Sequence, residues 1–158
     1  LDEIMGTYYI SLNDQEEPFT DVRVRKALSL AIDRDYVANT IMQGTYEPAY
    51  NFVGPGIVDE TGMFYDNANG GERYISEDYE ANLEEAKSLL ADAGYPDGEG
   101  FPTITYSAND AGYHVPVAEY VQQAWGDLGG PASCPCAAPV TMTSAVTVGS
   151  WTTTILPT

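Results

Sequence analysis

The sequence predicts an α/β domain in which helices pack on a short mixed sheet. Three segments place apolar residues at the spacing of one helix face, and two shorter segments carry residues typical of strands. Their order along the chain is strand, helices, loop, helix, strand and helix, which is typical of helices that cover a sheet. With 158 residues and 44% hydrophobic content, the chain is long enough for one core but short for two domains.

The first strand is predicted over residues 6–13, a β-branched and aromatic run that ends at the turn-forming pair Asn13 and Asp14. We expect this strand to be well buried. An irregular loop is predicted over residues 44–62, where prolines and glycines are frequent and neither the helix nor the strand period is present. Loops of this kind often line ligand clefts.

A helix over residues 18–32 is the most strongly patterned segment of the chain. Pro18 cannot lie inside a helix, while Thr20 and Asp21 can accept hydrogen bonds from the free amides of the first turn. Apolar residues then recur on one face, at Val24, Leu28 and Ala31. Asp33 or Asp35 can cap a second, shorter helix that ends at Gly44 and carries Val37 and Ile41.

The basic residues of this helix allow two interpretations. Arg23, Arg25 and Lys26 could form an anion-binding site, or they could lie on a solvated face of the helix. We favour the solvated face, because helix-spaced or capping carboxylates nearly cancel their charge, namely Asp21, Asp33 and Asp35.

The second half of the chain repeats the pattern of helix and strand. The polar residues 65–80 contain no calcium loop, because Ala68 and Gly70 occupy two of the positions that need oxygen ligands. A helix is predicted over residues 82–93, with Gly94 placed to end it. A turn, a short strand, a loop and a third amphipathic helix follow, at residues 95–102, 103–107, 109–114 and 117–128.

Composition excludes several functional classes. The 24 acidic and 6 basic residues give a formal charge of −18, which repels nucleic acids and anionic membranes. The single histidine, the absence of Gly-x-Ser-x-Gly and the lack of metal-spaced ligands predict neither an enzyme nor a cofactor or metal site. No apolar run approaches membrane-spanning length, and the start at Leu1 leads us to expect a piece of a longer protein. Cys134 and Cys136 are too close for an unstrained disulfide.

The composition changes abruptly at residue 129. No charged residue occurs from Leu128 to Thr158, whereas all 30 charges lie in the preceding 127 residues. Residues 1–128 are therefore predicted to form the domain, and residues 129–158 an irregular tail rich in Thr, Pro and Ser. Such a tail is typical of a disordered linker or an added segment.

Five blocks together resemble one protein family. They are GTYYISLN (6–13), PFTDVRVRKALSLAIDR (18–34), PAYNFVGPGI (48–57), EEAKSLLADAGYPDG (84–98) and the helix through Trp125. In this order they resemble the oligopeptide-binding proteins of bacterial ABC transporters, solute-binding family 5. The resemblance implies a partial C-terminal lobe of a type II periplasmic-binding-protein fold. It also implies a peptide ligand, a membrane permease as partner, and a periplasmic or extracellular location with a lipid anchor on some parents.

The resemblance also suggests where a peptide would bind. His114 lies where the oligopeptide branch places a pocket histidine, and Tyr106 and Asn109 share its neighbourhood. Each has an alternative role, because a lone loop histidine is often solvated or caps the next helix. A tyrosine in an alternating strand is more often a core or cross-strand residue.

The tail has a third interpretation that follows from the resemblance. Family members carry, after this lobe segment, a motif whose aspartate grips the free amino group of the peptide. Codons for residues 139–158 read from their third base permit GDYDIGRNGWIVDYNDPT, which resembles that motif. Met142 and Trp151 have no alternative codons, and each supplies the G that begins an Asp codon. We therefore expect residues after about 128 to be translated out of frame, with marginal stability and weakened peptide affinity.

Two functions are compatible with these observations. The first is the peptide-binding component of an ABC import system, present here as a truncated fragment. The second is a non-binding structural or interaction fragment with an acidic surface.

Overall fold

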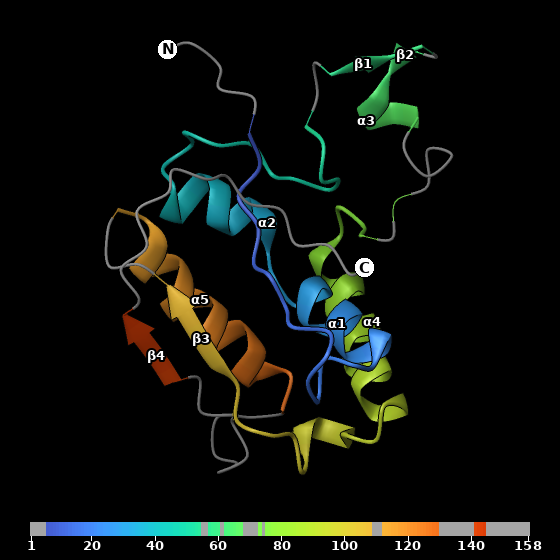
Figure 1. Cartoon of the computed structure of the whole chain (residues 1–158), viewed down its shortest axis with the longest axis vertical. Coiled ribbons are helices and arrows are strands. Elements are labelled where there is room, and N and C mark those ends of the chain that lie inside the picture. The colour runs from blue at the N-terminus through green and yellow to red at the C-terminus, as the bar shows by residue number, and fades with distance from the viewer. Residues whose placement is uncertain are drawn as a thin grey trace.

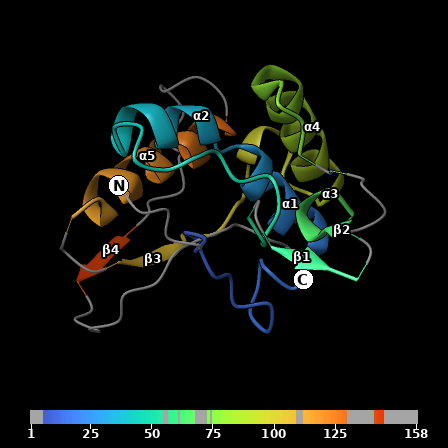
Figure 2. The ribbon, with the colours of Figure 1, turned by 90° about the horizontal axis from the view of Figure 1, so that it is seen from above.

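A computed structural model describes residues 6–54, 57–60, 62–67, 73, 75–108, 112–129 and 141–144. Two helices, α1 (Val22–Leu30) and α4 (Tyr79–Asp92), lie side by side (Figures 1 and 2). Helix α5 (His114–Asp127) packs beside the strand β3 (Thr105–Ala108) and against the π-helix η1 (Val37–Ile41). The short helix α2 (Arg34–Tyr36) leads directly into η1.

Carboxylate caps start three helices. Asp21 accepts a hydrogen bond from the Arg23 amide at 2.8 Å, so α1 begins at Val22, four residues after the predicted start. Asp33 caps α2 and accepts from the Tyr36 amide at 2.9 Å, which decides between the two predicted caps. Asp78 caps α4 in the same way. The φ angles of Gly44 and Gly94 are +69° and +97°, as expected for glycines that end helices.

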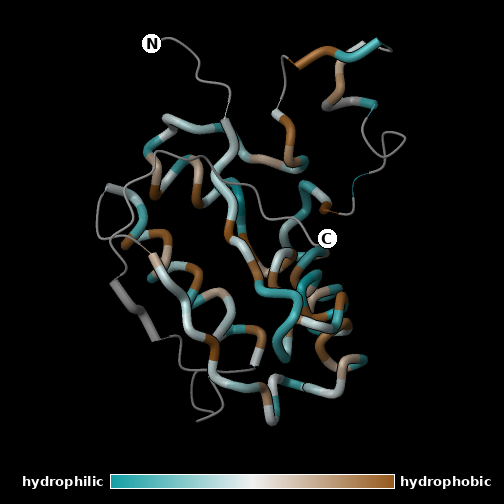
Figure 3. The backbone as a smooth tube through the Cα atoms, viewed as in Figure 1, coloured by the Kyte–Doolittle hydropathy of each residue, from teal (hydrophilic) through white to brown (hydrophobic). Residues whose placement is uncertain are grey.

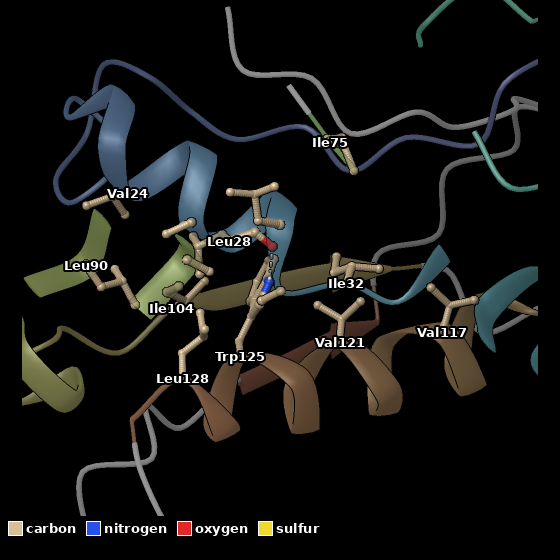
Figure 4. Packing of buried hydrophobic residues seen from close by; sticks show 14 of the residues in the cluster. Val24, Leu28, Ile32, Ile75, Leu90, Ile104, Val117, Val121, Trp125 and Leu128 are labelled. Carbon is tan, nitrogen blue, oxygen red and sulfur yellow. Dashed lines mark hydrogen bonds between the residues drawn. The ribbon is translucent and has the colours of Figure 1, made fainter. Parts of the chain in front are cut away.

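Side chains from other elements satisfy the carbonyl groups at the end of α1. The Ile32 amide donates to the backbone carbonyl of Ser29 and not to that of Leu28. The Leu28 carbonyl accepts from the N–H of the buried Trp125 indole at 2.9 Å (Figure 4). Tyr79 of α4 donates to the Ala31 carbonyl at 3.3 Å. Arg34 donates to the carbonyls of Ser29 and Ile32. The end of α1 therefore joins α4, α2 and α5.

The core lies between α1, α4 and α5. Hydrophobic and hydrophilic residues alternate along these helices, as amphipathic packing requires (Figure 3). The predicted apolar positions of all three helices contribute buried residues, among them Val24, Leu28, Ala86, Leu90, Val117 and Val121. None of the helices in the described part of the chain is long and apolar enough to cross a membrane.

The strand predicted over residues 6–13 is wrong. Only Tyr8 makes an isolated bridge, and half-buried residues alternate with exposed ones from Tyr8 to Asn13. Side-chain bonds hold it in place of a strand ladder. Thr7 donates through its hydroxyl to the Phe52 carbonyl at 2.6 Å, and Tyr8, Ile10 and Leu12 pack on the core.

The described strands pair in two separate sheets. β3 begins two residues later than predicted and pairs in parallel with β4 (Thr141–Ser144), with Thr105 opposite Thr141. β4 lies in the segment that was predicted to be irregular throughout. β1 (Val58–Asp59) and β2 (Gly62–Met63) form an antiparallel hairpin that leads into α3 (Phe64–Asn67), apart from the other helices (Figure 1). This hairpin interrupts the end of the predicted irregular loop.

A glycine contact closes the turn before β3. Gly98 ends the short 3-10 helix η3 (Pro96–Gly98) with φ +72°, and a Cβ atom there would lie 2.7 Å from the Gly129 Cα. Gly100 has a similar φ of +75°, but nothing lies within 4 Å of its position.

This pair of glycines gives a matched test. Gly100→Ala is expected to lower the free energy of unfolding by about 1 kcal/mol, the cost of the left-handed conformation. Gly98→Ala is expected to cost about 2 kcal/mol more, because the methyl group also forces two backbone segments apart. Urea unfolding of both variants measures the difference. Equal losses would show that the contact with Gly129 does not restrict residue 98.

Candidate functional site

His114, the predicted ligand residue, begins helix α5 and is half-buried. Its Nδ1 atom lies 3.0 Å from the hydroxyl of Tyr8, and the two rings stack with centroids 5.4 Å apart. When the proton of the neutral imidazole is on Nε2, the Tyr8 hydroxyl donates to Nδ1. This bond fixes the plane of the His114 ring. The Nε2–H group then remains as a donor for a ligand.

Tyr106, the second predicted residue, lies on β3 and joins the same group. Its hydroxyl lies close enough to that of Tyr8 for each to shift the pKa of the other, and its ring meets the Trp125 ring edge-on with centroids 6.4 Å apart. The structure thus brings Tyr106 and His114 together around Tyr8, and we call these three residues the Tyr8 cluster. Asn109, the third predicted residue, lies outside the described residues.

Sequence reasoning did not identify the central residue of this cluster. Tyr8 was assigned to a strand, and its contact with His114 joins residues separated by 106 positions. The recurrence of apolar residues at every second position, Tyr8, Ile10 and Leu12, was the available signal, because these three side chains pack on the core. Two exposed tyrosines extend the cluster toward solvent: Tyr46 lies close enough to affect the pKa of Tyr8, and its ring meets that of Tyr113 edge-on.

A small cavity adjoins the cluster. Its volume is about 80 Å³, and Tyr8 lines it together with apolar residues of η1 and α5, including Val37, Val117 and Val121. Arg34 and Glu47 contribute the charged part of the lining. Ligand pockets that enclose a small molecule are typically about 300–1,000 Å³. The cavity therefore has room for part of a ligand, such as one small side chain.

Charged groups elsewhere do not converge on a site. Arg23 pairs with Asp21, which lowers the pKa of that carboxyl, and also donates to the Asp92 carbonyl at the end of α4. Lys26 pairs with Glu85.

The predicted solvated face is wrong for Arg25, which is 8% exposed and donates to the Phe19 and Thr20 carbonyls. Among the described residues, no group of His, Cys, Asp and Glu could hold a metal ion.

Burial gives the tyrosines of this fold unusual acid–base properties. Burial, which disfavours the charged phenolate, is the largest cause of the raised pKa of four tyrosines: Tyr8, Tyr106, Tyr79 and Tyr120. It also raises the pKa of Tyr50 to about 12, with help from a hydrogen bond to Asp35. All five are protonated at neutral pH, so those of the Tyr8 cluster can serve as hydrogen-bond donors.

These shifts predict alkaline destabilisation. In the unfolded chain a tyrosine ionises near pH 10, whereas the folded chain retains these protons at higher pH. The stabilising contribution is fully present below about pH 10, and the free energy of unfolding falls as pH rises further. Urea unfolding at several alkaline pH values, together with phenolate absorbance, measures this. Complete ionisation near the ordinary tyrosine pKa without unfolding would contradict the prediction.

Comparison with known proteins places this geometry in context. The model for bacterial extracellular solute-binding proteins, family 5 (middle region), matches residues 2–133. The periplasmic oligopeptide-binding protein OppA of Escherichia coli K12 is 34% identical over 126 residues, covering 79% of this chain and 22% of OppA.

Solved structures give the same result. The murein tripeptide-binding protein MppA of Escherichia coli superposes with a TM-score of 0.67 and 26% identity, over 89% of this chain and 25% of MppA. An oligopeptide-binding protein of Borrelia burgdorferi, OppAIV, gives 0.66 and 27% over the same shares. The chain thus spans about a quarter of the length of these relatives.

Proposed function

Because the chain belongs to the bacterial extracellular solute-binding proteins of family 5, we propose that it is part of an oligopeptide-binding component of an ABC import system. Its fold is a partial lobe of a type II periplasmic binding protein, with helices packed against short strands. The relatives that match are named as binding proteins, so the proposed role is recognition without catalysis. A membrane permease would receive the peptide from the complete protein.

The proposed site is supported by one observation: two predicted ligand residues, His114 and Tyr106, lie around the phenol of Tyr8. In the proposal, His114 and Tyr106 contact the peptide, and Tyr8 orients His114. Asn109 stays a ligand residue predicted from the sequence. A peptide backbone presents donors and acceptors at short intervals, and neutral phenols and imidazole can act as both. The small adjoining cavity would accept an apolar side chain of the peptide.

The location follows from the same relatives. OppA of Escherichia coli is named as periplasmic. We propose a periplasmic or extracellular location for this chain, and attachment of the parent protein to the membrane as a lipoprotein.

Equilibrium binding tests the proposed function. Isothermal titration calorimetry would compare tetra-alanine, its N-acetylated form and free alanine as ligands of the 158-residue chain and of the complete protein that contains it. We expect saturable binding of tetra-alanine by the complete protein, much weaker binding by the chain, and no binding of alanine. Failure of both proteins to bind any peptide would favour the alternative of a structural or interaction fragment with an acidic surface.

The out-of-frame origin of the tail is a separate proposal. It rests on the uncharged composition after Leu128 and on the alternative peptide that codons for residues 139–158 permit. Sequencing the encoding DNA tests it. We expect the DNA to encode GDYDIGRNGWIVDYNDPT in the alternative frame. A DNA sequence that does not encode this peptide would exclude the out-of-frame origin. The peptide would supply the aspartate that pairs with the amino group of the ligand.

A further inference from the structure

We propose that the folded state of this chain depends on molar concentrations of monovalent salt, so that the protein is built to work in a brine. The first observation is the charge balance. Even if each of the 6 basic residues neutralised a different carboxylate, 18 of the 24 acidic residues would keep their charge. Only two of the basic residues are lysines, at positions 26 and 87.

Two of the four arginines also stabilise the main chain of the fold. Arg25 and Arg34 direct guanidinium groups to main-chain carbonyls, at Phe19 and Thr20 and at Ser29 and Ile32, respectively. These bonds hold the two ends of α1, and the formal charge of the chain remains −18. The ion pairs found among the described residues are Arg23–Asp21, Lys26–Glu85, Arg73–Glu77 and Lys87–Glu84. Surface pairs of this kind contribute little to stability.

The excess carboxylates are crowded on the surface. On α4 and its flanks every acidic residue is exposed, and Glu80 and Glu84 are spaced as neighbours on one helix face. The other exposed carboxylates of this half of the fold are Glu77, Asp78, Glu85, Asp92, Asp97 and Glu99. At physiological ionic strength, charges about 8 Å apart still repel each other, whereas at 1 M salt the screening length is about 3 Å. Repulsion within the compact state therefore falls as salt rises.

The core is modest in comparison with this repulsion. Six of the buried apolar residues are alanines, and one is aromatic, Trp125, within the described part of the chain. An alanine buries much less apolar area than a leucine or phenylalanine and so stabilises less. Salt acts on both the repulsion and the core. It screens the carboxylates, and it also strengthens apolar burial. The effect is a diffuse cation atmosphere rather than a bound ion, and it does not depend on the proposed peptide-binding function.

Unfolding of the whole chain as a function of KCl tests this proposal. Far-UV circular dichroism would be recorded from about 0.1 M to about 3 M KCl, a range that shortens the screening length from about 10 Å to below 3 Å. We expect more than half of the helical signal at molar KCl to be lost at the lowest concentration, and the urea midpoint to rise with KCl. Equal signals and equal urea midpoints at both ends of the range would overturn the proposal. So would the absence of a cooperative transition at every salt concentration.

A charge-matched pair of variants separates repulsion from a general salt effect. Glu16, Glu60 and Glu99 are exposed and take part in none of the four ion pairs above. Replacing all three with Gln is expected to lower the KCl concentration at which half of the helical signal is present. Replacing the same three with Asp keeps the charge and should leave that concentration unchanged. An identical KCl requirement in the Gln variant, the Asp variant and the original chain would overturn the proposal.

Discussion

Trp125→Ala is expected to lower the free energy of unfolding by about 3–5 kcal/mol, one of the largest effects of any single substitution in this chain. The indole is 7% exposed and packs in the core cluster with residues of α1 and α4. Its removal leaves a cavity between these helices and removes the donor to the Leu28 carbonyl. Urea unfolding at molar KCl measures the loss.

Trp125→Phe separates the hydrogen bond from the packing. Phenylalanine keeps most of the apolar area but leaves the buried Leu28 carbonyl without its donor, which costs about 1–3 kcal/mol. The control is Tyr120→Phe, which removes a hydroxyl that accepts from the Asp33 amide at the junction with α2. A Trp125→Phe variant as stable as the original chain would show that the indole N–H does not hold the end of α1.

The second large effect is expected on peptide affinity. His114→Ala should weaken binding of tetra-alanine to the complete protein about tenfold, the value of one well-made hydrogen bond of about 1.4 kcal/mol. Val115→Ala shortens an exposed side chain next to His114 on α5 and serves as the matched control, with little change expected. Tyr8→Phe tests the orienting role.

The orienting role has its own readout. Without the Tyr8 hydroxyl, the ring of His114 loses the partner of Nδ1, so both tautomers become accessible. Nitrogen chemical shifts of the imidazole report the tautomer directly, and affinity should fall less than in His114→Ala. Unchanged shifts in Tyr8→Phe would exclude the orienting role, and unchanged affinity in His114→Ala would remove His114 from the site.

Local features of the fold were predictable because they depend on neighbouring residues. Asp21 and Asp33 cap helices through amides two or three positions away, and Gly94 ends a helix by its own backbone conformation. The strand predicted at residues 6–13 was wrong because β-branched and aromatic composition does not by itself form a ladder: the segment makes only an isolated bridge at Tyr8, and side-chain contacts help to hold it. The burial of Arg25 depends on how the turn at Phe19 folds back on α1, which periodicity does not encode.

The candidate site divides in the same way. The resemblance of the sequence to a family directed attention to His114 and Tyr106, and these two residues lie in one cluster. Tyr8 could not be found by motif, because its role depends on a contact between the N-terminal segment and the start of α5, 106 positions away. The parallel pairing of β4 with β3 was also unpredictable, since the segment carries no charge pattern and lies in the atypical tail.

The most direct test of the proposed peptide-binding site is to locate a bound peptide on the folded chain. Nuclear magnetic resonance at molar KCl would follow the amide and side-chain signals of the 158-residue chain while Ala-Ala-Ala-Cys carrying a nitroxide label is added. We predict that signals of Tyr8, Tyr106 and His114 broaden first, and that unlabelled tetra-alanine reverses the broadening. Broadening confined to other surfaces, such as the β1–β2 hairpin, or uniform broadening that tetra-alanine does not reverse, would contradict the proposed site.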